Sequence, residues 1–294
     1  MIKKRIITGL SLVLFSFFFY FLPNGEIKFL IFVGLTIKAS QEMLIIFNKE
    51  EKKVSSQKSF SKNFIIIILT LLFFIILFIF LQKQKLLPNQ VRFLDKIPFS
   101  FDKYSFFLLF SPFILLLFFF VFLSSWHTSD LAKIFLIMIY IGVGMSCLLT
   151  LILSTLPYLL FFVLLIVLTD SFAFLARFPR FCPFLNLGLL VPHLSPKKTK
   201  KGAILGTLGS VIATFIFFFT WNKINNYSLF IFFAFAISII SQISDLLASK
   251  FKRDFNIKDF GNILPGHGGF LDRFDSWLLT AFFSLFFFTF IFLN

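Results

Sequence analysis

Acidic residues are scarce in this sequence, and so are cysteine and charge of either sign. Only 13 of the 294 residues are Asp or Glu, charged residues make up 14% of the chain, and two residues are cysteine. The low charged fraction excludes a coiled coil, and two cysteines (Cys147 and Cys182) are too few for a secreted disulfide scaffold. We expect both cysteines to serve packing.

Apolar residues, by contrast, are abundant. They make up 59% of the chain, and 53 residues are Phe. Soluble domains have roughly 45–50% apolar residues, and a soluble fold with this composition would expose large apolar patches. The composition therefore excludes an ordinary cytosolic domain and a disordered chain, and it predicts an integral membrane protein.

Nine apolar runs are long enough to cross a bilayer, which takes about 20 residues per helix. The runs are continuously apolar rather than alternating, so they predict helices and not a β-barrel. We therefore expect an all-α polytopic membrane protein with a single multi-pass domain, residues 1–294. The expected spans are Ile6–Leu22, Ile27–Phe47, Phe64–Leu81, Ser105–Ser125, Leu131–Ser154, Leu156–Ala176, Ala203–Trp221, Tyr227–Ser249 and Ser276–Leu293.

The basic residues of the loops predict the orientation of these spans. With the N-terminus in the cytoplasm, 19 Lys and Arg residues lie on the cytoplasmic side and 7 on the other. Cytoplasmic loops carry the excess of positive charge, so this orientation is favoured, although the basic loop 83–103 disagrees. The basic residues form no continuous domain, so the net charge of +15 indicates anionic membrane lipids as partners and no nucleic acid.

Because acids are so few, their positions are informative. Asp170 and Asp245 come near the ends of the sixth and eighth expected spans, and Asp272 and Asp275 precede the ninth. All four fall on the expected cytoplasmic side. An acid at the end of an apolar helix is unfavourable unless it is solvated, paired or bound to a metal, so solvation at the interface stays an alternative for the first two. The other two are three residues apart and can share one face of a helix.

A basic, glycine-rich loop joins the last two spans. It begins around Lys252 and Arg253, and it ends in glycines around His267 that let backbone N–H groups approach an anion closely. Acids and bases beside a glycine-rich turn suit phosphate chemistry through a divalent metal.

From Ser249 to Asp275 this segment resembles the signature of the phosphatidate cytidylyltransferase (CDP-diacylglycerol synthase) family. Phe270 departs from it, because an aliphatic residue is usual there. Fifteen of the 27 positions match at the family's spacing: Ser249, Phe251, Lys252, Arg253, Lys258, Asp259, Gly261, Leu264, Pro265, His267, Gly268, Gly269, Asp272, Arg273 and Asp275.

Two further stretches resemble the same family. Ser195-Pro196-Lys197-Lys198-Thr199 matches its SPKKT stretch, and Asp170, Ala173 and Arg177 match a third motif more loosely. Apart from the resemblance, two adjacent lysines would equally suit contact with anionic lipid, and that alternative stays open.

Four positions depart from the family pattern. Ala248 and Lys201 stand where the family usually has Glu, Phe174 replaces a Tyr, and Ala176 replaces a Gly. A carboxylate missing at position 248 removes negative charge near a metal site. Either neighbouring acids compensate, or the protein is a weakened or repurposed relative.

The resemblance implies an enzyme that converts CTP and phosphatidate to CDP-diacylglycerol and diphosphate. It implies Mg²⁺, with a second cation left open, held by Asp245, Asp272 and Asp275. We expect the glycine turn at His267 to offer backbone N–H groups to the diphosphate portion. The catalytic residues implied are Asp245, Asp272, Lys252, Arg253 and Arg273, and the substrate-binding residues are Ser195, Lys197, Lys198, Thr199, Lys258, His267, Gly268, Gly269 and Asp170.

Two other functional classes stay open. A lipid or ion transporter would explain the spans but not the acids and bases gathered in one loop, and a non-catalytic scaffold protein would explain Ala248 and Lys201. We expect divergent helices in residues 1–155 and catalytic helices and loops in 156–294. The expected location is the cell (inner) membrane, with the site facing the cytoplasm and with homodimer formation left open.

Overall fold

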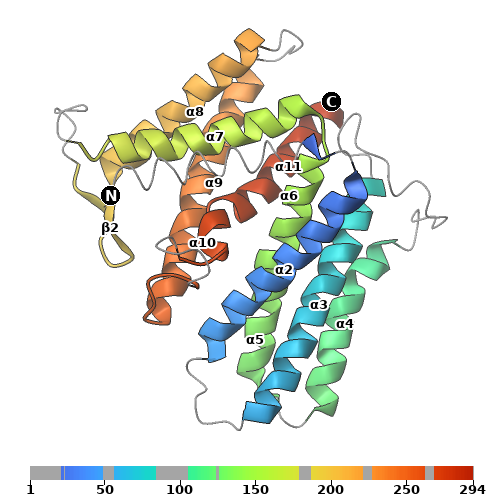
Figure 1. Cartoon of the computed structure of the whole chain (residues 1–294). Helices are drawn as coiled ribbons and strands as arrows, with labels where there is room; N and C mark the ends of the chain where they lie inside the picture. Colours follow the sequence, from blue (N-terminus) through green and yellow to red (C-terminus); the bar gives the residue numbers. More distant parts are fainter. Residues whose placement is uncertain are drawn as a thin grey trace.

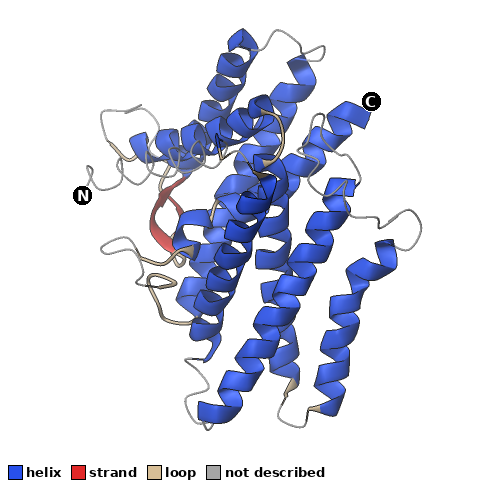
Figure 2. Ribbon diagram, turned by 45° about the vertical axis from the view of Figure 1, so that its right-hand side comes forward, coloured by secondary structure: helices blue, strands red, loops and turns tan. Residues whose placement is uncertain are grey.

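Figure 1 shows a computed structural model of the chain, which describes residues 21–22, 24–48, 56–83, 105–123, 126–178, 187–220, 227–261 and 268–293. Most of these residues are helical (Figure 2). Six helical segments are long and apolar enough to cross a membrane, so the chain is a multi-pass membrane protein. They are Gly25–Asn48, Ser61–Gln82, Thr128–Ile152, Leu156–Leu175, Lys200–Phe218 and Ser228–Asp254.

The helices follow the predicted apolar runs closely. Each of the second to ninth expected spans coincides with helical structure, and the first lies almost entirely outside the described residues. The number of nine spans and the orientation of the N-terminus stay predictions. The helices are α2 (Gly25–Asn48), α3 (Ser56–Lys83), α4 (Ser105–Phe122), α5 (Thr128–Ile137), the π-helix η2 (Met138–Val143), α6 (Gly144–Ile152), α7 (Leu156–Leu175), α8 (Lys200–Thr220), α9 (Tyr227–Asp254), α10 (Leu271–Phe274) and α11 (Trp277–Leu293).

The fifth expected span is built from three parts, α5, η2 and α6. Glycines at its centre allow close packing: a Cβ added at Gly142 would lie 2.8 Å from the Phe73 ring, and one at Gly144 would lie 2.7 Å from Cβ of Leu278. The chain then turns at 153–155, and Pro157 stands in the first turn of α7, where a proline is tolerated. The predicted break between the fifth and sixth spans is therefore confirmed.

Helices α2, α3 and α4 lie side by side, and α3 packs on η2 and α6 (Figure 1). On the other side of the molecule α8 packs between α7 and α9. Its glycines allow this packing, since a Cβ at Gly206 would lie 3.0 Å from the Thr169 carbonyl oxygen and one at Gly209 would lie 2.8 Å from that of Leu168. The Thr169 hydroxyl also donates to the Ser238 hydroxyl at 3.1 Å, which ties α7 to α9.

A small antiparallel hairpin, β1 (Leu189–Val191) and β2 (Ser195–Thr199), stands beside the helices (Figure 2). The prediction of an all-α protein did not include it, and the SPKKT stretch was expected in a loop. The hairpin leads directly into α8, since β2 ends at Thr199 and α8 begins at Lys200. Thr199 Oγ1 accepts a hydrogen bond from the Gly202 N–H at 3.0 Å. Thr199 thus caps the start of α8, and the hairpin is held at a fixed place at that end.

Candidate functional site

Three carboxylates are carried by α9 and the α10 region, two neighbouring helices in Figure 1 that an ion pair between Lys252 and Asp272 joins. Asp245 lies on α9, Asp272 lies on α10, and Asp275 follows directly after α10. Burial raises the pKa of Asp275 to about 7; the charge of Asp245 adds to this rise, Lys252 opposes it, and Asp272 and Asp170 add further. Asp245 and Asp272 therefore both lie near enough to Asp275 to act on the charge of its carboxyl group.

Asp245 does not end its helix, and this corrects the prediction. Helix α9 continues to Asp254, so Lys252 and Arg253 form its last turn and do not belong to the loop that was expected there. Two basic residues at the C-terminal end of a helix are favourable because they face the negative end of its dipole. The extension places a carboxylate and two cations on one rigid element.

Lys252 holds the two acids of the α10 region together. Its ammonium nitrogen lies 2.9 Å from Asp272 Oδ1 and 3.5 Å from Asp275 Oδ2, and its side chain is 12% exposed. The same nitrogen lies 5.1 Å from the centre of the Phe260 ring. One cation between two carboxylates confirms that Asp272 and Asp275 face the same side, as their spacing predicted.

The hairpin supplies a second cation. Lys198 Nζ lies 2.5 Å from Asp245 Oδ2, with the two side chains 19% and 33% exposed. Asp170 on α7 interacts electrostatically with both Asp245 and Lys198. The SPKKT hairpin, the α7 motif and α9 therefore meet at one point, which no local pattern in the sequence could show.

Asp272 is also the residue that closes the signature loop. Its Oδ2 accepts hydrogen bonds from the backbone N–H groups of Phe260 at 2.7 Å and Gly269 at 2.9 Å. Gly268 has φ of +83°, a conformation that favours glycine, and a Cβ there would lie 2.9 Å from Asp272 Oδ2. At Gly269 the backbone N–H therefore binds the chain's own carboxylate, and diphosphate binding by the turn at His267 stays a prediction.

The other predicted residues lie in different surroundings. Arg253 donates to the carbonyl oxygens of Leu194 and Ile257 at 3.3 Å each, so it joins the hairpin turn to the end of α9. Arg273 has a buried Nε without a hydrogen-bond partner in the described part of the chain. Lys197 and Lys258 are exposed, Ser195 begins β2, and His267 lies outside the described residues.

Two residues of the site were missed by the sequence analysis. Glu42 on α2 is 2% exposed and binds the start of α10; an acid within an apolar span could have indicated it. Tyr140 on η2 packs against Phe251 of α9, with the ring centres 5.6 Å apart, and its buried hydroxyl has no hydrogen-bond partner among the described residues. π-Helices are frequent at functional sites, but hydropathy does not distinguish them from α-helices.

The carboxylates suit a small divalent cation that takes its remaining ligands from the substrate. No group of three His, Cys, Asp or Glu side chains within the described ranges is arranged to hold a metal ion alone. Mg²⁺, however, binds one or two carboxylates and takes its remaining oxygens from phosphate and water. The Lys252 ammonium already lies between Asp272 and Asp275, so a positive charge is favourable there. The oxygen donors of the site therefore fit Mg²⁺.

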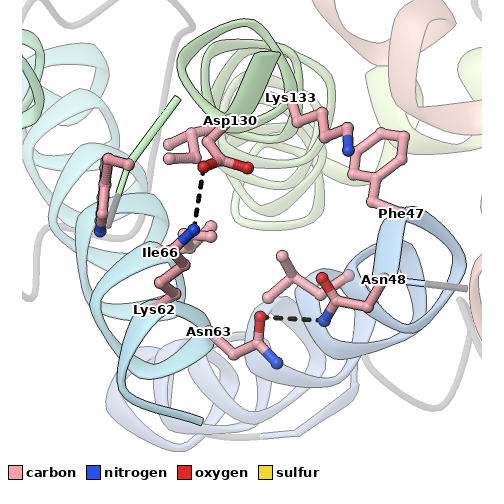
Figure 3. Close-up of a pocket in the computed structure, with 10 residues that line it drawn as sticks. Phe47, Asn48, Lys62, Asn63, Ile66, Asp130 and Lys133 are labelled. Carbon is pink, nitrogen blue, oxygen red and sulfur yellow. Dashed lines mark hydrogen bonds and ion pairs between the residues drawn. The ribbon is translucent and has the colours of Figure 1, made fainter. Parts of the chain in front are cut away.

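A separate pocket lies between α2, α3 and α5, away from these acids (Figure 3). An ion pair between Lys62 and Asp130 at 3.1 Å and a hydrogen bond from Asn48 to Asn63 at 3.0 Å cross it. Its volume of about 20 Å³ has room for about one water molecule, so it cannot hold a nucleotide.

Comparisons with known proteins show which family the chain resembles. A model of the cytidylyltransferase family matches residues 3–291. Over 98 residues, 31% of this chain and 42% of the relative, the chain is 50% identical to the phosphatidate cytidylyltransferase of Rickettsia bellii. Over 141 residues, 48% of this chain and 52% of the relative, it is 37% identical to that of Staphylococcus haemolyticus. The matches span about half the length of these curated relatives.

Proposed function

Because the chain belongs to the cytidylyltransferase family, we propose that it transfers the cytidylyl group of CTP to phosphatidate. The products would be CDP-diacylglycerol and diphosphate. The observation that carries this proposal is the contact between the SPKKT hairpin and the acids of the signature region, through Lys198 and Asp245. Stretches far apart in the sequence thus form one charged site in a multi-pass membrane protein, where a lipid and a nucleotide would meet.

The chemistry requires charge neutralisation more than proton transfer. An oxygen of the phosphatidate phosphate attacks the α-phosphorus of CTP, a new P–O bond forms, and the bond to the β-phosphate oxygen breaks with its electron pair on diphosphate. Both reactants are anions, so the site has to bring them together and align them. Lys198, Lys252 and Arg273 would neutralise phosphate charge, and the Arg273 Nε, which has no partner among the described residues, would donate to a phosphate oxygen.

We propose that Asp245 and Asp272 hold Mg²⁺, with Asp275 beside them. When bound, Mg²⁺ would act as a Lewis acid on the phosphate oxygens and orient CTP. The chain itself fixes the carboxylates: Lys198 orients Asp245, and Lys252 with two backbone N–H groups orients Asp272. The lipid phosphate is already ionised, so the site needs no general base, and direct displacement needs no nucleophile such as Ser195.

The direct test uses the purified full chain in detergent with radiolabelled CTP and phosphatidate, with and without Mg²⁺. We expect label to enter lipid only when both phosphatidate and Mg²⁺ are present, together with release of diphosphate. A protein that binds CTP without forming labelled lipid would instead be a scaffold, and the absence of both would exclude the proposal.

The two lysines of the hairpin are expected to differ. Lys198 is half-buried and pairs with Asp245, whereas Lys197 is exposed. We expect Lys198→Ala to lower kcat/KM for CTP by about 10- to 100-fold, in the range for groups that orient metal-site carboxylates. Lys197→Ala, the matched control, should lower it by a few-fold at most. Equal effects would contradict the specific role of Lys198 and favour a shared contact with anionic lipid.

We also propose that the site faces the cytoplasm, where CTP is available. Lys200 and Lys250 are exposed on the two segments that form the site. In a chain with Cys182→Ser, cysteines introduced at these positions should resist an impermeant thiol reagent in intact cells and react after permeabilisation. The remaining Cys147 is buried and serves as the unreactive background. Labelling of both positions from outside would reverse the proposed orientation.

A further inference from the structure

We propose that Glu42 of α2 is a positioning residue for the signature loop, an inference that rests on the proposed cytidylyltransferase activity. Its carboxyl group accepts two hydrogen bonds from the start of α10. Phe270 N–H donates to Oε1 and Leu271 N–H donates to Oε2, both at 2.8 Å. The partners are 228 and 229 residues away in sequence. One side chain of the N-terminal helices thus holds the element that carries Asp272.

The loop is shaped to receive this carboxyl group. A Cβ added at Gly261 would lie 2.8 Å from Glu42 Oε1, and one added at Gly269 would lie 2.6 Å from Oε2 and 2.6 Å from the Gly261 nitrogen. Both halves of the loop therefore close on Glu42, and glycine at these two positions is needed for that approach. The same glycines belong to the family signature, which gives them a packing role here in addition to any contact with substrate.

The local chemistry explains why an acid stands in an apolar helix. The first N–H groups of a helix have no partner within it, and a buried one has to be satisfied by another group. Helix α10 is four residues long, so it cannot hold its own orientation by internal hydrogen bonds. Glu42 accepts hydrogen bonds from the N–H groups of Phe270 and Leu271, and the Gly269 N–H just before them donates to Asp272.

The consequence reaches the proposed metal ligands. Asp272 lies one residue after Leu271, and Lys252 bridges Asp272 to Asp275. A second contact, between the rings of Phe47 on α2 and Phe255 after α9 at 5.1 Å, fixes the same end of α2 against the loop. If the Glu42 hydrogen bonds are lost, α10 can rotate and the two carboxylates lose their shared orientation. Residues 1–155 would thus contribute directly to the geometry of the site.

The test compares Glu42→Gln and Glu42→Ala with Glu26→Gln, an exposed acid in the first turn of the same helix. Gln keeps the size of the side chain but only one acceptor oxygen, so one of the two N–H groups loses its partner. We expect kcat to fall about 10-fold for Gln and about 100-fold for Ala, with KM for CTP changed by less than about 3-fold, as for other groups that orient metal ligands. Glu26→Gln should match the unmodified chain.

Hydrogen exchange supplies a readout that does not depend on activity. The amides of Phe270 and Leu271 should exchange faster in both Glu42 variants, while exchange in α7 and α8 stays unchanged. Unchanged kcat and unchanged exchange in an active protein would overturn the inference, and so would a uniform loss of protection throughout the chain. If the unmodified chain forms no CDP-diacylglycerol, the proposed function fails, and the exchange result alone decides whether Glu42 holds the loop.

Discussion

Asp245→Asn and Asp272→Asn should each lower turnover by about 100-fold or more, the size expected when a group that stabilises transition-state charge is removed. Asn keeps the size of the side chain and removes its charge. Asp245→Asn would remove the attraction to the Lys198 ammonium, which lies 2.5 Å from the aspartate. Asp272→Asn would remove the charged contact with Lys252 at 2.9 Å. Either change also removes a proposed oxygen ligand of Mg²⁺.

The matched control is Asp254→Asn, on the same helix as Asp245. Asp254 is exposed and, among the described residues, forms its ion pair with the exposed Lys250 four residues before it, at 2.6 Å. Exposed pairs of this kind contribute little, so its activity should stay within about 2-fold of the unmodified chain. Mg²⁺-dependent CDP-diacylglycerol synthesis is measured for all three variants at equal amounts of folded, membrane-inserted protein. Near-normal synthesis by both Asp245→Asn and Asp272→Asn would show that the metal assignment is wrong.

The two acids should also differ from one another. Asp272 accepts hydrogen bonds from the N–H groups of Phe260 and Gly269, so its replacement disturbs the loop as well as the charge. Asp245 makes no such bond to the loop in the described residues. Backbone exchange at 258–261 and 268–270 should therefore rise in Asp272→Asn and stay unchanged in Asp245→Asn, a difference that separates loop closure from metal binding.

The sequence predicted the parts of this fold that depend on local patterns. The apolar runs marked helices α2 to α9 and α11, because burial in a bilayer requires length and continuity. The three-residue spacing of Asp272 and Asp275 predicted their shared side. Hydropathy failed at the end of α9, since the residues after Ser249 are polar enough to read as a loop while their backbone continues as helix to Asp254.

The missed parts of the site depend on contacts between distant segments. The two bonds of Glu42 join residues more than 200 positions apart, and no periodicity records such a pair. An acid in an apolar run is unfavourable until its partner is known, and the partners of Glu42 cannot be identified from the sequence. Ala248, where the family usually has an acid, is fully buried in the hydrophobic core. An unpaired carboxylate would be strongly unfavourable there, so alanine suits the packing of this chain.

Lys252→Met is expected to have an effect as large as that of the aspartate changes. Met has a similar length and flexibility but no charge, so it fills the space and removes the cation between Asp272 and Asp275. These two side chains are 6% and 17% exposed, and two buried carboxylates without a cation repel one another. Breaking a buried pair in this way typically destabilises a protein by about 3 kcal/mol, so we expect a lower melting temperature together with a loss of turnover of about 100-fold.

Lys250→Met is the control, because it changes the same residue type two positions earlier, where the side chain is 52% exposed. It should keep both the melting temperature and the activity. Lys252→Arg separates charge from geometry: the guanidinium keeps the positive charge, but it is planar and cannot place one nitrogen between the two acids as the ammonium does. We therefore expect the Arg variant to recover the melting temperature and only part of the turnover. If Lys252→Met folds normally and retains full activity, the Lys252 bridge contributes neither to stability nor to turnover. Two buried acids that tolerate the loss of the ammonium must already be neutral or separated.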